Sequence, residues 1–282
     1  MLRRALLINE TSFGSGHPTV ASSLNNLAAL FYVTKRPAEA EAMMRRALLI
    51  TEATLGTDHP EVATKLNNLA QLLQSAGRLV EAESLMRRAL LINESIFGKN
   101  HPMVGSSLNN LASFFYNTKR HADAEPLLRR ALLINESSFG IDHPTVASSL
   151  NNLATLLYVT NRTNEAEPLM RRMVNIILDC SRATGHQHPD LNAFVGNYAA
   201  LLRAMGKAED DIREIFDMLG CRYGIDLTRS GGHAEIETST KLRHIFEKLM
   251  QDQSKFPEIV AQLQQEDPAL LMEFLSYIER QK

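Results

Sequence analysis

The chain has 282 residues, 44% of them hydrophobic, so it can bury a substantial core and is not disordered throughout. Its formal net charge of −2 gives no electrostatic basis for binding nucleic acid or an anionic membrane surface, because both favour a clustered basic face. Cys180 and Cys221 stand far apart, and no apolar stretch approaches the length of a membrane span. We therefore expect a cytoplasmic protein without metal or other cofactors.

A phrase that begins with His-Pro recurs along the chain. The histidines of these pairs stand at positions 17, 59, 101, 143 and 188, so the step is 42 residues three times and then 45. Arg-Arg pairs keep the same step and begin at positions 45, 87, 129 and 171. Such regularity indicates a repeat architecture.

The predicted elements follow this step. Residues 1–14 match the second half of a unit and predict one helix. Two-helix units are expected at about 17–56, 59–98, 101–140 and 143–185, and a degenerate unit at 188–220. Each first helix starts at the proline of His-Pro, where a missing N–H costs nothing, and each second helix stops before a glycine. Residues 221–233 are predicted to be a linker and residues 234–282 a C-terminal helical segment.

Three details of the second helices carry further predictions. Pro126 and Pro168 fall near the first turn and are expected to delay or bend the start of the helix. The three extra residues of the last step are expected to lengthen the fourth second helix. Glutamate and arginine four residues apart predict ion pairs on an exposed helix face, at Glu41–Arg45, Glu83–Arg87, Glu125–Arg129 and Glu167–Arg171.

The fold class follows from the apolar faces of the helices. A single helical hairpin cannot cover its own apolar face, but stacking on the next hairpin does so and produces a superhelix. The sequence therefore predicts an all-α protein, an α-solenoid with a small C-terminal helical extension. The partial unit at residues 1–14 lacks a first helix, which leaves apolar surface open and favours self-association through this end.

The phrases "HPxVAxxLNNLA" and "AExLxRRALxI", together with the small residues Ala28, Ala40 and Ala47, carry a family resemblance. They resemble tetratricopeptide repeats, and the 42-residue step is similar to the variant in kinesin light chains. The resemblance covers about residues 1–220. It implies a helix–turn–helix stack that binds a protein or peptide partner in its concave groove.

The residues give no sign of an enzyme. There is no phosphate-binding glycine loop, no GxSxG and no HExxH motif. Histidines one repeat apart cannot share a metal ion, because stacked helices lie about 8–10 Å apart whereas zinc–nitrogen bonds are about 2 Å. We interpret the repeated histidines as turn residues at helix entrances.

The asparagine pairs need an explanation, because asparagine is a poor helix former in mid-helix. One interpretation is that they hydrogen-bond between adjacent hairpins and hold the stack. The other, raised by the resemblance, is that they present amides along the groove, where they suit a peptide backbone. The candidate groove residues are these asparagines and the polar residues about one turn away: Asn25, Asn26, Asn67, Asn68, Asn109, Asn110, Asn151, Asn152, Asn197, Ser22, Thr64, Ser106, Ser148, Gln71, Tyr116 and Tyr158.

The function predicted from the sequence is a non-enzymatic interaction scaffold or adaptor. Two alternatives stay open: a structural or oligomerising repeat module, and a regulatory fragment of a larger multidomain protein. The acidic residues at 234–282 also suggest that this segment folds back over the repeats and occupies the groove.

Overall fold

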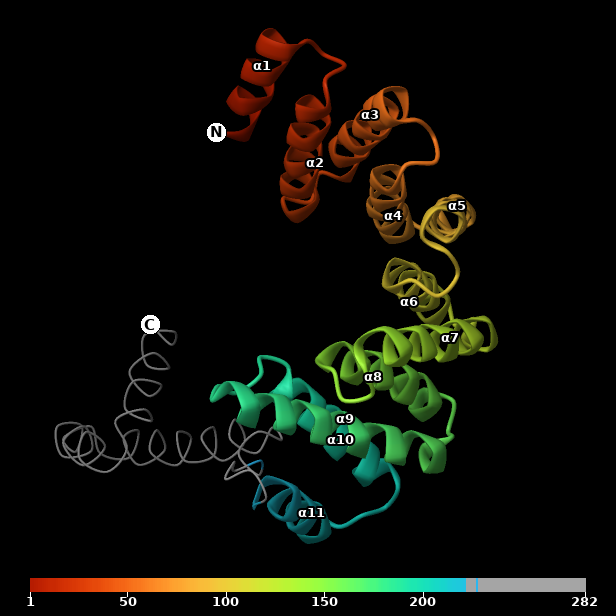
Figure 1. The fold of residues 1–282 in the computed structure, drawn as a ribbon, viewed down its shortest axis with the longest axis vertical. Helices are drawn as coiled ribbons and strands as arrows, with labels where there is room; N and C mark the ends of the chain where they lie inside the picture. Colours follow the sequence, from red (N-terminus) through yellow and green to blue (C-terminus); the bar gives the residue numbers. More distant parts are fainter. Residues whose placement is uncertain (222–226, 228–282) are drawn as a thin grey trace, which may run out of the picture. The chain divides into compact units, whose positions relative to one another are not determined.

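The computed structural model describes residues 1–221 and residue 227. Within these residues eleven α-helices follow one another and no strand occurs, which confirms the all-α prediction (Figure 1). The C-terminal helical segment, its suggested place in the groove and nearly all of the predicted linker lie outside the described residues. The chain divides into two compact units, Met1–Met173 and Val174–Lys282.

The helices have the order predicted from the repeats. The partial unit forms α1 (Leu2–Phe13). The first helices of the four full repeats are α2 (Pro18–Val33), α4 (Pro60–Ser75), α6 (Pro102–Asn117) and α8 (Pro144–Val159). The second helices are α3 (Pro37–Leu55), α5 (Leu79–Phe97), α7 (His121–Phe139) and α9 (Thr163–Thr184). The degenerate repeat forms α10 (Leu191–Ala204) and α11 (Glu209–Cys221).

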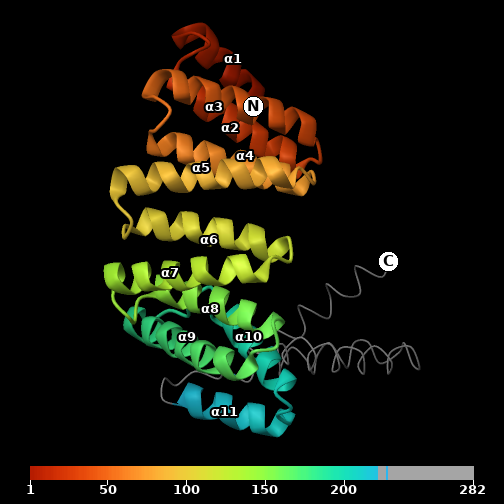
Figure 2. The same ribbon diagram turned by 90° about the vertical axis from the view of Figure 1, so that its right-hand side faces the viewer.

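In the first compact unit, Met1–Met173, successive hairpins stack as layers (Figure 2). The first helices α2, α4 and α6 lie on the inner side of the stack, and the second helices α3, α5 and α7 lie on the outer side (Figure 1). Each of these first helices packs against two second helices, its own and the preceding one. Leu24, Leu66 and Leu108, at equivalent positions, have no solvent exposure. The stack therefore buries the apolar face that a single hairpin would leave open.

Small residues allow the two helices of a repeat to approach closely. In the first repeat, Ala28 of α2 and Ala40 of α3 are fully buried in one cluster with Leu27 and Phe31. Leu72 of the next first helix joins the same cluster. The packing of one hairpin is therefore completed by the following repeat.

A histidine caps the start of each first helix. The N-cap residues are His17, His59, His101 and His143, each with extended backbone. Each imidazole Nδ1 accepts a hydrogen bond of 3.2–3.3 Å from the backbone N–H two residues later. The acceptor satisfies an N–H that has no partner within the helix. The sequence predicted a turn residue here, and the structure gives it a capping role.

Aromatic stacking adds to three of these caps. The ring of Phe97, at the end of α5, stacks on His101 with a centroid distance of 4.7 Å. Phe13 on His17 and Phe139 on His143 stack at 4.9 Å. The end of one second helix thus contacts the cap of the next first helix, which fixes the connection between repeats.

The second helices follow the sequence prediction except at the prolines. The helices α7 and α9 start at positions equivalent to the start of α3, so Pro126 and Pro168 lie inside helices and do not delay them. The expected lengthening is confirmed, since α9 has 22 residues and α3, α5 and α7 have 19 each. Gly56, with φ of 87°, ends α3 in the left-handed region that glycine tolerates.

The second compact unit holds the C-terminal end of α9 together with α10 and α11. The rings of Tyr198 on α10 and Phe216 on α11 meet edge to face at 5.7 Å. Both side chains are buried. The shorter helices of the degenerate repeat, 14 and 13 residues long, agree with the weaker pattern of this stretch.

The histidine cap can be tested by substitution. His101→Ala removes the acceptor for the Met103 N–H and the stacking on Phe97, so we expect the free energy of unfolding to fall by about 0.5–2 kcal/mol. His101→Asn keeps a capping acceptor and should retain more of the stability than alanine does. Urea and thermal unfolding followed by circular dichroism measure both. Equal stability of wild type and the alanine variant would remove the capping role.

Candidate functional site

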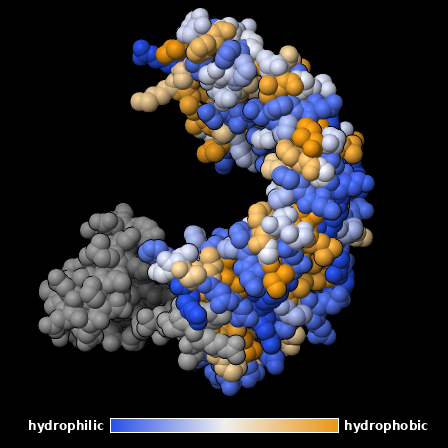
Figure 3. Space-filling view, in the orientation of Figure 1, coloured by the Kyte–Doolittle hydropathy of each residue, from blue (hydrophilic) through white to orange (hydrophobic). Residues whose placement is uncertain are grey.

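The predicted groove residues that belong to the first compact unit lie on the first helices of the repeats. On this side of α2, α4 and α6 the surface is hollowed and mixes hydrophilic with hydrophobic residues (Figure 3). The four residues about one turn before the asparagine pairs, Ser22, Thr64, Ser106 and Ser148, are exposed. Among the asparagine pairs, Asn26 and Asn152 are exposed and the other six are half-buried. The polar strip expected from the sequence therefore reaches solvent along the first helices.

One hydrogen bond joins asparagines of neighbouring repeats. Asn68 Nδ2 on α4 donates to Asn25 Oδ1 on α2 at 3.3 Å. The second asparagine of one pair thus meets the first asparagine of the pair before it. For this pair, the stack-holding interpretation has direct support.

Two other asparagines carry an unpaired oxygen. Asn67 Oδ1 on α4 and Asn109 Oδ1 on α6 are buried and accept no hydrogen bond. A buried acceptor without a partner costs about 1–3 kcal/mol. These amides are therefore the places where an additional donor would stabilise the inner side most.

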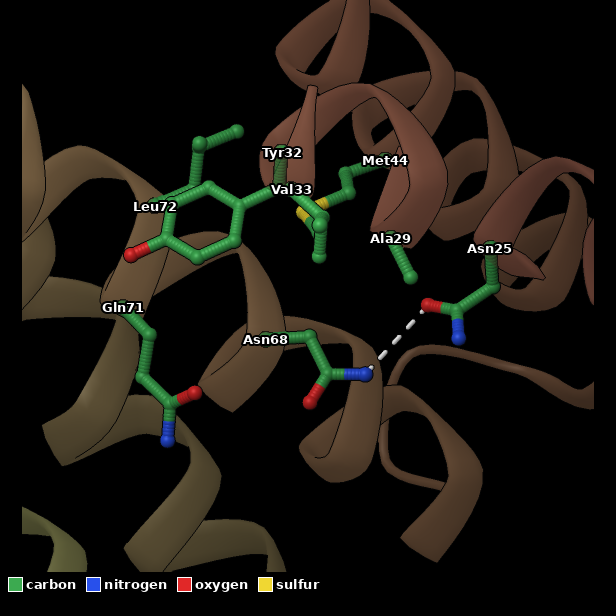
Figure 4. Close-up of a pocket in the computed structure, with 8 residues that line it drawn as sticks. All are labelled: Asn25, Ala29, Tyr32, Val33, Met44, Asn68, Gln71 and Leu72. Atoms are coloured by element: carbon green, nitrogen blue, oxygen red, sulfur yellow. Dashed lines mark hydrogen bonds between the residues drawn. The ribbon is translucent and has the colours of Figure 1, made fainter. Parts of the chain in front are cut away.

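A pocket of about 280 Å³ opens beside the asparagine hydrogen bond (Figure 4). The residues that line it come from α2, α3 and α4: Asn25, Ala29, Tyr32, Val33, Met44, Asn68, Gln71 and Leu72. Figure 4 shows Asn25 and Asn68 linked along one side of the pocket, with Tyr32 on another side above Gln71. The pocket therefore combines amide groups with an apolar wall.

The structure brings together only part of the predicted set. Asn25, Asn68 and Gln71 share the pocket, whereas Tyr116 and Tyr158 are half-buried on α6 and α8 and do not line it. Asn197 is exposed on α10 and belongs to the second compact unit.

Several pocket residues were absent from the predicted set. Met44 and Leu72 are apolar residues at helical spacing, so their sequence context indicates only a core. Ala29 and Tyr32 have different residues at the equivalent positions of the next repeat, Gln71 and Gln74. This variation beside constant asparagines was the available signal.

A second set of asparagines lies where one repeat meets the next, and Asn93 and Asn135 of this set are buried. Asn93 Nδ2 at the end of α5 donates to Ser107 Oγ on α6 at 2.8 Å. The same bond joins Asn9 to Ser23 and Asn135 to Ser149, also at 2.8 Å. The recurrence of asparagine in "LLINE" and of serine fourteen residues later was the signal for this contact. It is architectural, because these groups face the neighbouring helix.

The arginine pairs stabilise the outer side. The predicted ion pairs within second helices are confirmed at Glu41–Arg45, Glu83–Arg87, Glu125–Arg129 and Glu167–Arg171. The second arginine of each pair has another role that sequence reasoning missed. Arg88 contacts Glu52 of the preceding second helix at 2.7 Å and also donates to the backbone oxygen of Thr57. Equivalent contacts between helices link Arg46 to Glu10, Arg130 to Glu94 and Arg172 to Glu136.

A third arginine position extends this network. Arg162, before α9, contacts Glu125 of α7 at 2.7 Å. Arg120 and Arg78 make the equivalent contact one and two repeats earlier. Hydrogen bonds from Arg162 and from Arg129 hold the pKa of the Glu125 carboxyl below its usual value. The arginines therefore join successive repeats and do not converge on a binding site.

The described residues hold no group of three or more histidine, cysteine, aspartate or glutamate side chains arranged to bind a metal ion. None of the helices there combines the length and apolar character needed to cross a bilayer.

Comparison with known proteins agrees with this architecture. The tetratricopeptide repeat profile matches residues 19–90, 61–115 and 103–179, more than half of the chain. The protein therefore belongs to the tetratricopeptide repeat family, whose fold is that of protein–protein interaction modules. No curated protein sequence matches the chain.

Two solved structures show the same fold with kinesin light chain-like repeats. The kinesin light chain TPR-like repeats of Podosopora anserina have a TM-score of 0.59 and 23% identity, covering 72% of this chain and 94% of that chain. BtubC (BKLC) from P. vanneervenii has a TM-score of 0.61 and 24% identity, covering 76% of this chain and 86% of that chain. The predicted resemblance to kinesin light chain-like repeats is confirmed.

The ion pairs between repeats predict a pH effect. Arg162→Ala removes the main cause that lowers the pKa of Glu125, so this pKa should rise toward its usual value. A lowered carboxyl pKa contributes stability above the unfolded-state pKa, and this stability is lost as the pH falls through the folded-state pKa. Wild type should therefore lose more stability on acidification than the variant. Carboxyl NMR titration measures the pKa, with Arg171→Ala as the control that leaves Glu125 unchanged.

Proposed function

We propose that the protein is a non-enzymatic scaffold or adaptor that acts in the cytoplasm. It binds an extended peptide of a protein partner along the inner side of its first helices. The observation that carries this proposal is the row of half-buried asparagines, joined at Asn25–Asn68 and incompletely satisfied at Asn67 and Asn109.

The asparagines suit a peptide backbone. An amide side chain offers donors and an acceptor, so it can bond to a backbone whatever side chains that backbone carries. A peptide N–H that meets Asn67 or Asn109 supplies the missing donor once the amide turns toward the groove. Asparagine in mid-helix reduces helix stability, and this binding role would account for its recurrence.

The pocket beside Asn25 supplies selectivity for side chains. Its walls include Val33, Met44 and Leu72, which favour an aliphatic or methionine side chain, and Gln71 adds a polar contact at its edge. The equivalents of Ala29 and Leu72 in the next repeat are the larger residues Gln71 and Phe114. The constant amides would hold the backbone, and these varied neighbours would select its side chains.

The groove can be tested with peptides selected from a displayed random library on the wild-type chain. The double variant Asn68→Ala, Asn110→Ala should keep its helical content, with a melting temperature lowered only slightly by loss of the Asn25–Asn68 bond, and should bind the selected peptides at least about tenfold more weakly. Fluorescence anisotropy measures the affinity.

The matched control lies on the outer side. Leu49 and Leu91 are exposed on second helices, and replacing both by alanine should leave the affinity unchanged. Equal binding by the groove variant and wild type would contradict the proposal. Loss of folding in the groove variant would instead assign the asparagines to the stack.

The alternative of self-association through the partial N-terminal unit has weaker support. The helix α1 has no buried residue. However, among the described residues the first helices α2, α4 and α6 are each already packed between two second helices. In a second copy of the chain these three helices are therefore not open to contact with α1. The groove is therefore the better supported function.

A further inference from the structure

The first helices of the full repeats carry almost no charged residues. The helices α2, α6 and α8 contain no aspartate, glutamate, lysine or arginine. By contrast, the second helices α3, α5 and α7 carry five such residues each. The inner side of the first compact unit, which the first helices form, therefore differs sharply in charge from the outer side.

The helix α4 holds two charged residues, and both lie away from the pocket between α2 and α4. Glu61 is in the first turn of the helix, seven residues before Asn68 and so about 10 Å from it along the axis. Lys65 is half-buried at the position that Ser107 occupies one repeat later, where the side chain faces the preceding second helix. Neither residue lines the pocket.

Arginines in the turns after the first helices are paired with carboxylates. Arg120, after α6, contacts Glu83 at 2.5 Å and Asp123 at 2.8 Å, and the turn arginines of the neighbouring repeats are paired in the same way. Lys35 and Lys119 are exposed in the same turns and do not line the pocket. A ligand that lies along the asparagines of the described first helices therefore meets amides, hydroxyls and apolar groups rather than charged side chains.

This chemistry penalises a charged ligand. A carboxylate or ammonium group that leaves water needs a partner of opposite charge, and its burial without one is costly. The amides of Asn68 and Gln71 can form hydrogen bonds with such a group, but they do not neutralise it. Serine, threonine, asparagine and glutamine side chains are satisfied by the same amides without that cost, since an amide both donates and accepts. A groove of this composition discriminates against charge by leaving it unpaired.

We propose that the groove binds an uncharged segment of its partner. This segment is an extended stretch of serine, threonine, asparagine, glutamine or glycine that places an aliphatic or methionine side chain in the pocket. The inference rests on the proposed function and specifies the class of its ligand. Because the two surfaces match without charge, neither acidic nor basic peptides are favoured, and binding is insensitive to salt. Charged residues of the partner lie outside the stretch that contacts α2, α4 and α6.

Peptides selected on the wild-type chain from a displayed random library test the composition of the segment. Charged residues should be depleted in the selected peptides relative to the unselected library. The affinity of the tightest peptide should change less than about threefold between about 0.05 and 0.5 M sodium chloride. Enrichment of acidic or basic residues, or a larger loss of affinity with salt, would overturn the proposal.

A charge-exchange experiment tests the cause. Each residue of the tightest peptide is replaced in turn by glutamate, and replacements within the bound stretch should weaken binding at least about tenfold. The variant Gln71→Lys supplies a partner and should restore at least about tenfold for one of these glutamate peptides. Ser84→Lys, at an exposed position of α5, is the matched control and should restore none. Equal binding of the glutamate peptides to the two lysine variants would contradict the inference.

Failure of the groove function itself gives a different result. If the selected peptides bind the Asn68→Ala, Asn110→Ala variant as tightly as the wild type, they do not lie in the groove, and both the function and this inference are wrong. If that variant loses binding but the selected peptides are charged, the groove function stands and only the uncharged ligand is excluded.

Discussion

The packing of each first helix between two second helices is the constraint on which the rest of the structure depends. The helix α4 contacts α3 and α5, and its Leu66 is fully buried as a result. Neither hairpin alone could remove this side chain from water, so each repeat is stable only with a neighbour. The same constraint leaves the inner side of the first helices free, since their buried faces point toward the second helices.

Polar groups at this contact set how the repeats align. The buried bond from Asn93 Nδ2 to Ser107 Oγ forms only when α5 and α6 hold one relative position. Arg130, reaching both Glu94 and the Lys99 carbonyl, fixes the outer edge of the same junction. Apolar packing thus supplies most of the cohesion, and these bonds select one alignment among several that would bury similar area.

The inner side combines a constant framework with local variation. Asparagines recur at the same place in four first helices, yet their surroundings differ, as Ala29, Gln71 and Ser113 show. A small residue at the first of these positions leaves room for the pocket between α2 and α4. Changes at a few exposed positions can therefore alter what the surface accepts without disturbing the buried leucines that hold the stack.

The sequence by itself determined the family, the helix order, the starts of the first helices and the ends of the second helices in the four full repeats, because capping histidines, prolines, terminal glycines and apolar faces are encoded by residues close together in the chain. Only the tertiary structure decided that Asn68 meets Asn25 and that Asn93 meets Ser107. It also showed that Pro126 does not delay α7. These outcomes depend on the rotation and shift between helices of different repeats, which many side-chain contacts fix together and no local pattern specifies.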